Sequence, residues 1–148
     1  MFISYILNSW WKQKEDTRFY YLALIRENDK WCIHGLWPQY SDNSYPTFCR
    51  KVEFDPKLLE PIMMDLNEYW HSDRGDNDTF WSHEWEKHGS CYFSKTINEF
   101  DYFDTTLKLY KKVIEECDLN DYRRGDEKAM IPIDLELNIM KRKVIDSY

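Results

Sequence analysis

Two apolar, aromatic-rich runs, residues 19–25 and 31–36, stand close together near the start of the chain. A polar, turn-like segment, Glu-Asn-Asp-Lys at 27–30, separates them. Short apolar runs on both sides of such a turn are typical of two antiparallel strands joined as a hairpin. The sequence therefore predicts a β-hairpin here, followed by a loop at residues 41–46.

The middle of the chain is patterned for helices. From residue 61 to residue 70 apolar side chains recur at helical spacing, and Pro61 is acceptable in a first turn. A second, short helix is predicted to start near residues 79–81 and to carry two histidines. Residues 96–99, Thr-Ile-Asn-Glu, have the form of a capping box that opens a long helix. The predicted buried stripe of this long helix is Phe103, Leu107, Tyr110, Ile114 and Cys117.

Strands are predicted towards both ends of the chain. Apolar and polar residues alternate from Ile131 to Ile139, which is typical of a strand with one face towards water. The apolar residues 1–7 predict an opening strand. Strands around a helical middle favour the α+β class, with a central antiparallel β-sheet packed against several α-helices. A length of 148 residues suits one domain, predicted to span residues 1–148.

Charge and hydropathy narrow the classes of function. The net charge of −7 counts against a protein that mainly holds nucleic acid, because such proteins present a basic face to the phosphates. An enzyme that acts on one phosphate at a time needs only local positive charge. No segment approaches the roughly 20 apolar residues of a membrane span, so we expect no membrane insertion.

The four cysteines leave their pairing open. Cys32, Cys49, Cys91 and Cys117 allow up to two disulfides, in three alternative pairings. None of them belongs to a CxxC pair, which argues against a structural zinc site.

Two segments carry residues suited to chemistry. Residues 31–38 read Trp-Cys-Ile-His-Gly-Leu-Trp-Pro and place His34 in an apolar strand. A single histidine in such a strand is more often structural than catalytic, so this segment alone is ambiguous. Residues 80–91 read Phe-Trp-Ser-His-Glu-Trp-Glu-Lys-His-Gly-Ser-Cys and carry a denser pattern.

On a helix, Glu84, Lys87 and His88 share one face, and His83 lies four residues before Lys87. A solvated polar face would explain Glu84 and Lys87, but it does not explain two histidines that flank them between tryptophans. A zinc protease is excluded, because its two histidines must lie four residues apart. Here they are five apart, and Lys87 occupies the position of the second ligand.

Together the two segments resemble the two active-site segments of the T2 family of ribonucleases, in the same order and at a comparable separation. The resemblance extends from about residue 19 to residue 117 and is weak outside that range. It implies the fold of that family and a metal-independent endoribonuclease that cleaves single-stranded RNA. The 2′-OH would attack the adjacent phosphorus, giving a 2′,3′-cyclic phosphate and then 3′-phosphate ends.

The resemblance also implies a role for each residue. His88 would be the general base and His34 the general acid, and imidazole suits both because its unperturbed pKa lies near about 6.5. His83 would hold the phosphate and share in the acid role. Lys87 would stabilise the negative charge that develops in the transition state. Glu84 would orient the neighbouring imidazole and ammonium groups.

The resemblance to the family also implies roles for four further residues. Trp37 is implied to pack at or near the active site, with a plain core position as the alternative. Gln39 stands where family members often have Asp or Asn; because this position helps form a base pocket, Gln39 is a substrate-binding candidate. Cys49 and Cys91 match a disulfide widespread in the family, with two unrelated buried thiols as the alternative.

The chain also departs from the family. Cys32 and Cys117 have no family partner and are expected to be buried free thiols. His71 stands where proline is common and is expected at the surface. Family members are usually secreted or found in lysosome- or vacuole-like compartments. No signal peptide is recognisable at the start of this sequence, so an intracellular location stays open.

Two alternatives from other functional classes remain. One is a catalytically silent relative that binds RNA or protein, although such a protein has no need for all five candidate catalytic residues. The other is a metal-dependent hydrolase. The leading prediction takes single-stranded RNA and not DNA as the substrate, and requires no metal, no cofactor and no obligatory protein partner.

Overall fold

The computed structural model describes residues 16–141. The elements follow in the order β1 (Phe19–Glu27), β2 (Lys30–Gln39), the 3-10 helix η1 (Pro56–Ile62), α2 (Met63–Tyr69), α3 (Asn77–Lys87), the 3-10 turn η2 (Gly89–Cys91), α4 (Glu99–Glu116), the 3-10 turn η3 (Leu119–Tyr122) and β3 (Lys128–Ile133). The strand expected at residues 1–7 lies outside the described residues.

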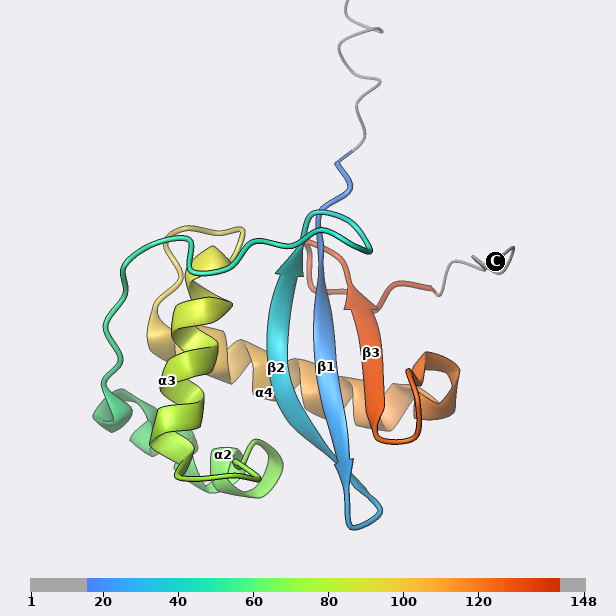
Figure 1. Ribbon diagram of the computed structural model, residues 1–148, viewed down its shortest axis with the longest axis horizontal. Coiled ribbons are helices and arrows are strands. Elements are labelled where there is room, and N and C mark those ends of the chain that lie inside the picture. The colour runs from blue at the N-terminus through green and yellow to red at the C-terminus, as the bar shows by residue number, and fades with distance from the viewer. Residues whose placement is uncertain (1–15, 142–148) are drawn as a thin grey trace, which may run out of the picture.

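The sheet is antiparallel and has the strand order β2-β1-β3 (Figure 1). The predicted hairpin is confirmed, since β1 pairs with β2 along its whole length. Asn28 and Asp29 form its turn with φ angles of 48° and 63°. Two consecutive residues with positive φ suit the right-handed twist of the strands, and Asn and Asp tolerate this conformation best after glycine. The predicted α+β class is confirmed.

The helices form a layer against the sheet. In Figure 1, α4 crosses behind the strands and α3 lies alongside β2. Tyr102 and Phe103 on α4 are fully buried and join the core that contains Leu22 of β1 and Ile131 of β3. Among the described residues, none of the helices has the length and apolar character needed to cross a membrane.

The predicted start of the long helix is wrong. Asn98 caps α4, its side-chain oxygen accepting from the backbone N–H of Asp101 at 2.8 Å. The Thr96 hydroxyl instead lies 3.3 Å from the hydroxyl of Ser94, within the turn that precedes the helix.

The predicted buried stripe of α4 is wrong at its end. Ile114 is 44% exposed, whereas Val113 is fully buried in its place. Three residues after Tyr110, the helix period carries residue 113 back to the sheet, and residue 114 falls at the margin of the stripe. Cys117 is half-buried rather than buried, because it follows the end of the helix.

The predicted strand at residues 131–139 is too long. β3 ends at Ile133, and the chain then turns back so that Ile139 bridges Ile133. The Asp134 carboxylate accepts from the backbone N–H groups of Glu136 and Asn138, both at 2.9 Å. An aspartate that bonds the backbone ahead of it favours a turn over a strand, which alternation alone does not reveal.

The predicted helix at residues 61–70 also starts later than expected. The 3-10 helix η1 extends to Ile62 with Pro61 inside it, and α2 begins at Met63. Leu66 and Trp70 are fully buried, as the helical spacing predicted.

Candidate active site

A β-bulge in β2 places the first candidate residue. Ala23 pairs with Gly35 and Leu24 with Ile33, so His34 has no partner in β1. In a regular strand residues 34 and 37 would point to opposite faces. The extra residue shifts the alternation and turns His34 and Trp37 to the same side, with ring centroids 5.0 Å apart.

Buried donors hold this bulge in position. The indole N–H of Trp70 donates to the carbonyl of His34 at 2.9 Å, and the indole N–H of Trp81 donates to the carbonyl of Trp70 at 2.6 Å. The Tyr102 hydroxyl donates to the carbonyl of Leu36 at 2.9 Å. All three aromatic side chains are at most 1% exposed, so these bonds are shielded from water. The backbone of His34 is therefore anchored by α2, α3 and α4 together.

α3 brings the second group of candidates to the bulge. Its first turn is capped by Asp76, whose carboxylate accepts from the backbone N–H of Thr79 at 3.2 Å. The helix ends at Lys87, and His88 is its C-cap. Gly89 begins the turn η2, so the predicted end of this helix is confirmed to within one residue.

Glu84 and His88 meet β2 at Trp37. Glu84 is 2% exposed, and its Oε1 accepts from the indole N–H of Trp37 at 3.0 Å. Its Oε2 lies 3.9 Å from Nε2 of His34. The ring of His88 stacks on the ring of Trp37, with centroids 4.9 Å apart and an angle of 22° between the planes. Trp37 thus contacts both histidines and the carboxyl group, which places it inside the site.

Gly35 permits this close approach. A methyl group at Gly35 would overlap Oε1 of Glu84 and would lie 2.6 Å from Nε1 of Trp37. Glycine at this position is required by the contact between β2 and α3 rather than by a turn.

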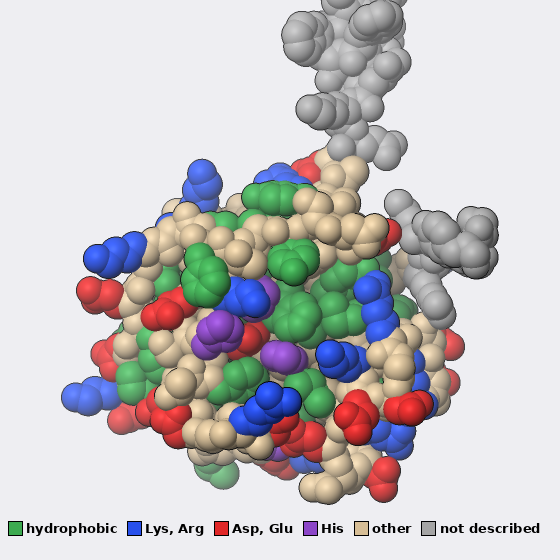
Figure 2. Space-filling model, in the orientation of Figure 1, with side chains coloured by type: hydrophobic (Ala, Val, Ile, Leu, Met, Phe, Trp, Pro, Cys, Tyr) green, Lys and Arg blue, Asp and Glu red, His purple; other side chains and the backbone are tan. Residues whose placement is uncertain are grey.

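The other candidates lie at the edge of this group. Lys87 is half-buried on α3, and His83 is exposed there, with its ring 6.2 Å from that of Phe48. Figure 2 shows histidine side chains gathered at the middle of this face, with basic side chains among them. Gln39 is buried at the end of β2 and donates to the carbonyl of Ser41 at 3.1 Å. Its role in binding a base stays a prediction.

Sequence reasoning missed two aromatic residues here. Phe80 lies on α3 with its ring 5.8 Å from that of His34. Phe48 is 58% exposed beside His83 and has a φ of 50°, which is uncommon for a bulky residue. Its backbone N–H donates to the carbonyl of Lys87 at 2.9 Å, which joins the loop to the end of α3. No periodic signal in the sequence marks either residue as part of the site.

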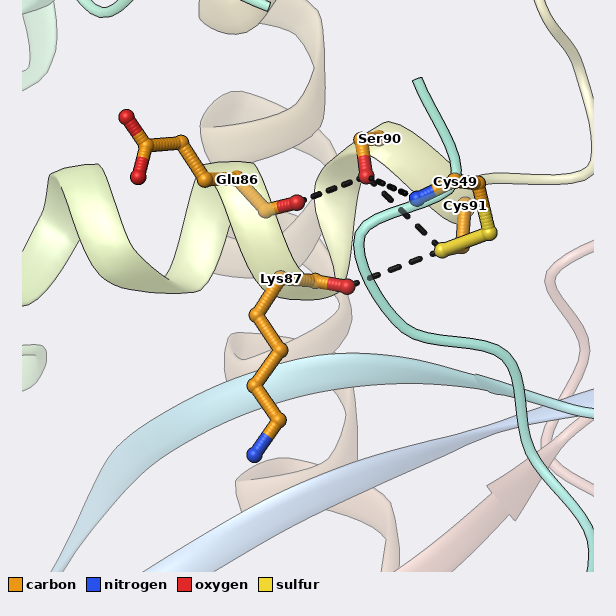
Figure 3. Close-up of a disulfide and its surroundings, with 5 residues drawn as sticks. All are labelled: Cys49, Glu86, Lys87, Ser90 and Cys91. Atoms are coloured by element: carbon orange, nitrogen blue, oxygen red, sulfur yellow. Dashed lines mark hydrogen bonds between the residues drawn. A yellow bond between two sulfur atoms is a disulfide. The ribbon is translucent and has the colours of Figure 1, made fainter. Parts of the chain in front are cut away.

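The predicted disulfide is confirmed. Cys49 is bonded to Cys91, across 42 residues, with Cα atoms 5.0 Å apart. The Ser90 hydroxyl donates to the carbonyl of Glu86 at 2.6 Å and accepts from the backbone N–H of Cys49 at 3.0 Å (Figure 3). In Figure 3 the Lys87 side chain points away from this disulfide towards the strands. The disulfide therefore fixes the end of α3, where Lys87 and His88 lie.

Burial governs the charges in the site. It raises the pKa of Glu84 to about 7, against the opposing effects of the Trp37 hydrogen bond and the Lys87 charge. It lowers the pKa of His88 to about 3, and the charges of Lys87, His34 and His83 act in the same direction. His88 Nδ1 is also buried with no hydrogen-bond acceptor among the described residues, which disfavours the doubly protonated ring. The pKa of His34 is lowered mainly by burial and then by Lys128.

The sequence profile of the Ribonuclease T2 family matches residues 4–124, a range that contains both histidine-bearing segments. The chain belongs to the ribonuclease T2 family. This confirms the resemblance predicted from the two histidine-bearing segments.

Similarity to named ribonucleases supports the assignment to the T2 family. Ribonuclease DdI of Dictyostelium discoideum is 35% identical over 113 residues, which are 74% of this chain and 51% of that protein. Ribonuclease T2 of Sus scrofa is 37% identical over 91 residues, which are 57% of this chain and 44% of that protein. This T2 chain therefore spans about half the length of these relatives.

A solved T2-like structure shares the fold. Ribonuclease MC1 from the seeds of bitter gourd matches with a TM-score of 0.56 and 28% identity. The match covers 64% of this chain and 58% of that one.

Proposed function

We propose that this T2-family domain is a metal-independent endoribonuclease that cleaves single-stranded RNA through a 2′,3′-cyclic phosphate to 3′-phosphate ends. The observation that carries the proposal is the packing of two imidazoles, His34 and His88, against one indole, Trp37. Two imidazoles in one site supply a base for the 2′-OH and an acid for the departing 5′-oxygen. DNA lacks the nucleophile and is not a substrate.

His88 is the general base in this scheme. Its low pKa keeps the ring neutral, and therefore able to accept a proton, down to about pH 3. His34 is the general acid, and Glu84, whose Oε2 lies 3.9 Å from Nε2 of His34, limits the movement of this ring by contact rather than by a hydrogen bond.

Positive charge at the edge of the site, beside His34 and His88, stabilises the phosphorane-like transition state. Lys87 and His83 lie one helical turn apart on α3, so both face the same phosphate. Trp37 and Gln39 contact the substrate, with Trp37 also holding Glu84 in place. A mutant of ribonuclease MC1 has been solved in complex with 5′-GMP, which supports a nucleotide as the ligand of this site. No cofactor and no protein partner is part of the proposed reaction.

The decisive experiment is an RNA cleavage assay in EDTA with identification of the product ends. Cyclic phosphate ends formed in EDTA would support the proposed reaction. Intact RNA from about pH 4 to about pH 8 would favour a catalytically silent binding protein. Cleavage that returns only after a divalent metal is added would indicate a metal-dependent hydrolase.

The pH profile of cleavage is expected to be bell-shaped and to lie on the acid side of neutrality. The base His88 must be neutral, so kcat/KM falls only as the pH approaches about 3. The acid His34 must be protonated, and burial lowers its pKa, so kcat/KM also falls at a pH below the usual imidazole pKa of about 6.5. Initial rates with a dinucleoside phosphate across this range test the profile, and an optimum on the alkaline side of neutrality would contradict it.

Gly35→Ala is expected to lower kcat/KM by about 100-fold, because displacing catalytic groups by about 1 Å has this effect. The added methyl group would displace Glu84 and Trp37 together. Gly75→Ala is the matched control, since a methyl group there meets no atom within 4 Å. Equal activity of the two variants would show that the contact between β2 and α3 is not critical for cleavage.

A further inference from the structure

We propose that Glu27, Cys32 and His71 form a Zn²⁺ site with one coordination position open to solvent. The three residues come from the end of β1, from β2 and from the segment after α2. Each offers one ligand atom, and these atoms all lie within 4.8 Å of one another. The site is separate from the proposed cleavage reaction, and the inference does not depend on that reaction.

The hairpin brings the first two ligands together. Cys32 pairs with Ile25 across the strands, and Glu27 lies two residues further along β1. Residues two apart in a strand share a face, so Glu27 and Cys32 are diagonal neighbours on the same side of the hairpin. Cys32 is a buried free cysteine, whereas 25% of the Glu27 side chain is exposed.

The third ligand is held in place by its neighbour in the chain. Trp70, directly before His71, donates to the carbonyl of His34 and accepts from the indole N–H of Trp81. The backbone that carries His71 is therefore fixed to β2 and α3. His71 Nε2 lies 2.7 Å from Oε2 of Glu27, so the imidazole already points at the hairpin. Its Nδ1 is buried with no hydrogen-bond partner among the described residues.

The donor set suits zinc. Thiolate, imidazole and carboxylate are its usual protein ligands, and bond lengths of about 2.0–2.3 Å put tetrahedral ligand atoms about 3.3–3.8 Å apart. The distance from His71 Nε2 to Glu27 Oε2 is 2.7 Å, slightly shorter than this spacing, and the three ligand atoms lie within 4.8 Å of one another, slightly longer than it. Small side-chain movements therefore suffice to reach the tetrahedral geometry. Thiolate and carboxylate together neutralise the metal charge, which makes its burial favourable. A soft thiolate also selects against Mg²⁺ and Ca²⁺.

Partial exposure leaves room for a water ligand. The side chains of His71 and Glu27 are 33% and 25% exposed, so the metal is accessible from their side. Three protein ligands with a solvent-filled fourth position form an exchangeable zinc site rather than a closed structural one. This differs from the structural zinc site that the absence of a CxxC pair argues against. The expected buried free thiol at Cys32 is confirmed, and 33% of the His71 side chain is exposed.

Metal titration tests the site directly. The protein is stripped of metal with EDTA, without reductant so that the disulfide stays intact, and then titrated with Zn²⁺ by calorimetry and with Co²⁺ by absorption. We expect one metal ion per chain and a near-ultraviolet thiolate-to-cobalt charge-transfer band that Zn²⁺ abolishes. The melting temperature should rise with added Zn²⁺, because the metal binds the folded state.

Variants assign the signal to particular residues. Cys32→Ser should remove the cobalt band, and Cys117→Ser, which removes the other free cysteine, should retain it. His71→Gln should weaken Zn²⁺ binding by roughly 100-fold or more, since even outer-shell partners of a ligand contribute about 10- to 100-fold. His88→Ala should bind Zn²⁺ normally, which excludes His88 as a ligand.

Several outcomes would overturn the proposal. One is the absence of saturable binding at micromolar Zn²⁺. Another is the absence of the cobalt band in the parent protein, and a third is a cobalt band that persists in Cys32→Ser. Because Cys32 is buried, circular dichroism must show that its variant folds. His71→Gln is an independent test, since its side chain is partly exposed, and unchanged Zn²⁺ affinity in that variant would also exclude the site.

Discussion

Replacing His88 with alanine is expected to lower kcat/KM for single-stranded RNA by about 10²- to 10⁴-fold, the usual contribution of one positioned general base. The loss should appear mainly in kcat, because the proposed role of His88 is to take the 2′-OH proton during the reaction. The ring is buried against Trp37, so the folded state of the variant must be checked by circular dichroism. Initial rates at several RNA concentrations separate kcat from KM.

The matched control for His88→Ala is Glu86→Gln. Glu86 lies on the same helix and is exposed; its backbone carbonyl accepts from the Ser90 hydroxyl, and its Oε1 accepts from the Ser82 hydroxyl at 3.4 Å, a bond that the glutamine oxygen can also accept. This variant should keep the parent rate. His34→Ala should lose activity as His88→Ala does, and the double variant should be little worse than either, because base and acid act as a unit. Full activity in folded His88→Ala protein would exclude this histidine as the base.

Removing the disulfide by replacing both Cys49 and Cys91 with serine is expected to lower the free energy of unfolding by about 2–4 kcal/mol. For a chain of this size that corresponds to a fall in melting temperature of about 4–16 °C. The bond joins the long connection after β2 to η2, the turn that follows α3, so its loss frees a large loop in the unfolded state. Calorimetric melting of the double variant measures the change.

Cys117→Ser is the control for this measurement. Cys117 is half-buried and free, so its replacement should change the melting temperature much less. The disulfide variant should also lose some activity, because the bond holds the turn that follows His88. A melting temperature equal to that of the parent protein would mean that packing of η2 alone fixes this end of the helix.

The residues on α3 were predictable because their signals are local, whereas the pairing of Cys49 with Cys91, 42 residues apart, was implied only by the family resemblance. A helical period puts Glu84, Lys87 and His88 on one side whatever the rest of the chain does. The same local logic placed the hairpin and the buried stripe from Phe103 to Tyr110. The predicted boundaries of elements were wrong where a side chain accepts a hydrogen bond from the backbone. Asn98 does so at the start of α4, and Asp134 does so after β3.

The sequence by itself determined which chemical groups this T2 domain carries and which of them share a helix face. The tertiary structure decided how those groups meet. The bulge at His34 cancels the strand alternation, and it is held by Trp70, a residue 36 positions away in the chain. The pKa values of Glu84 and His88 follow from burial, which depends on packing between elements. Contacts between distant segments assemble both the proposed active site and the proposed zinc ligands, and no local pattern encodes such contacts.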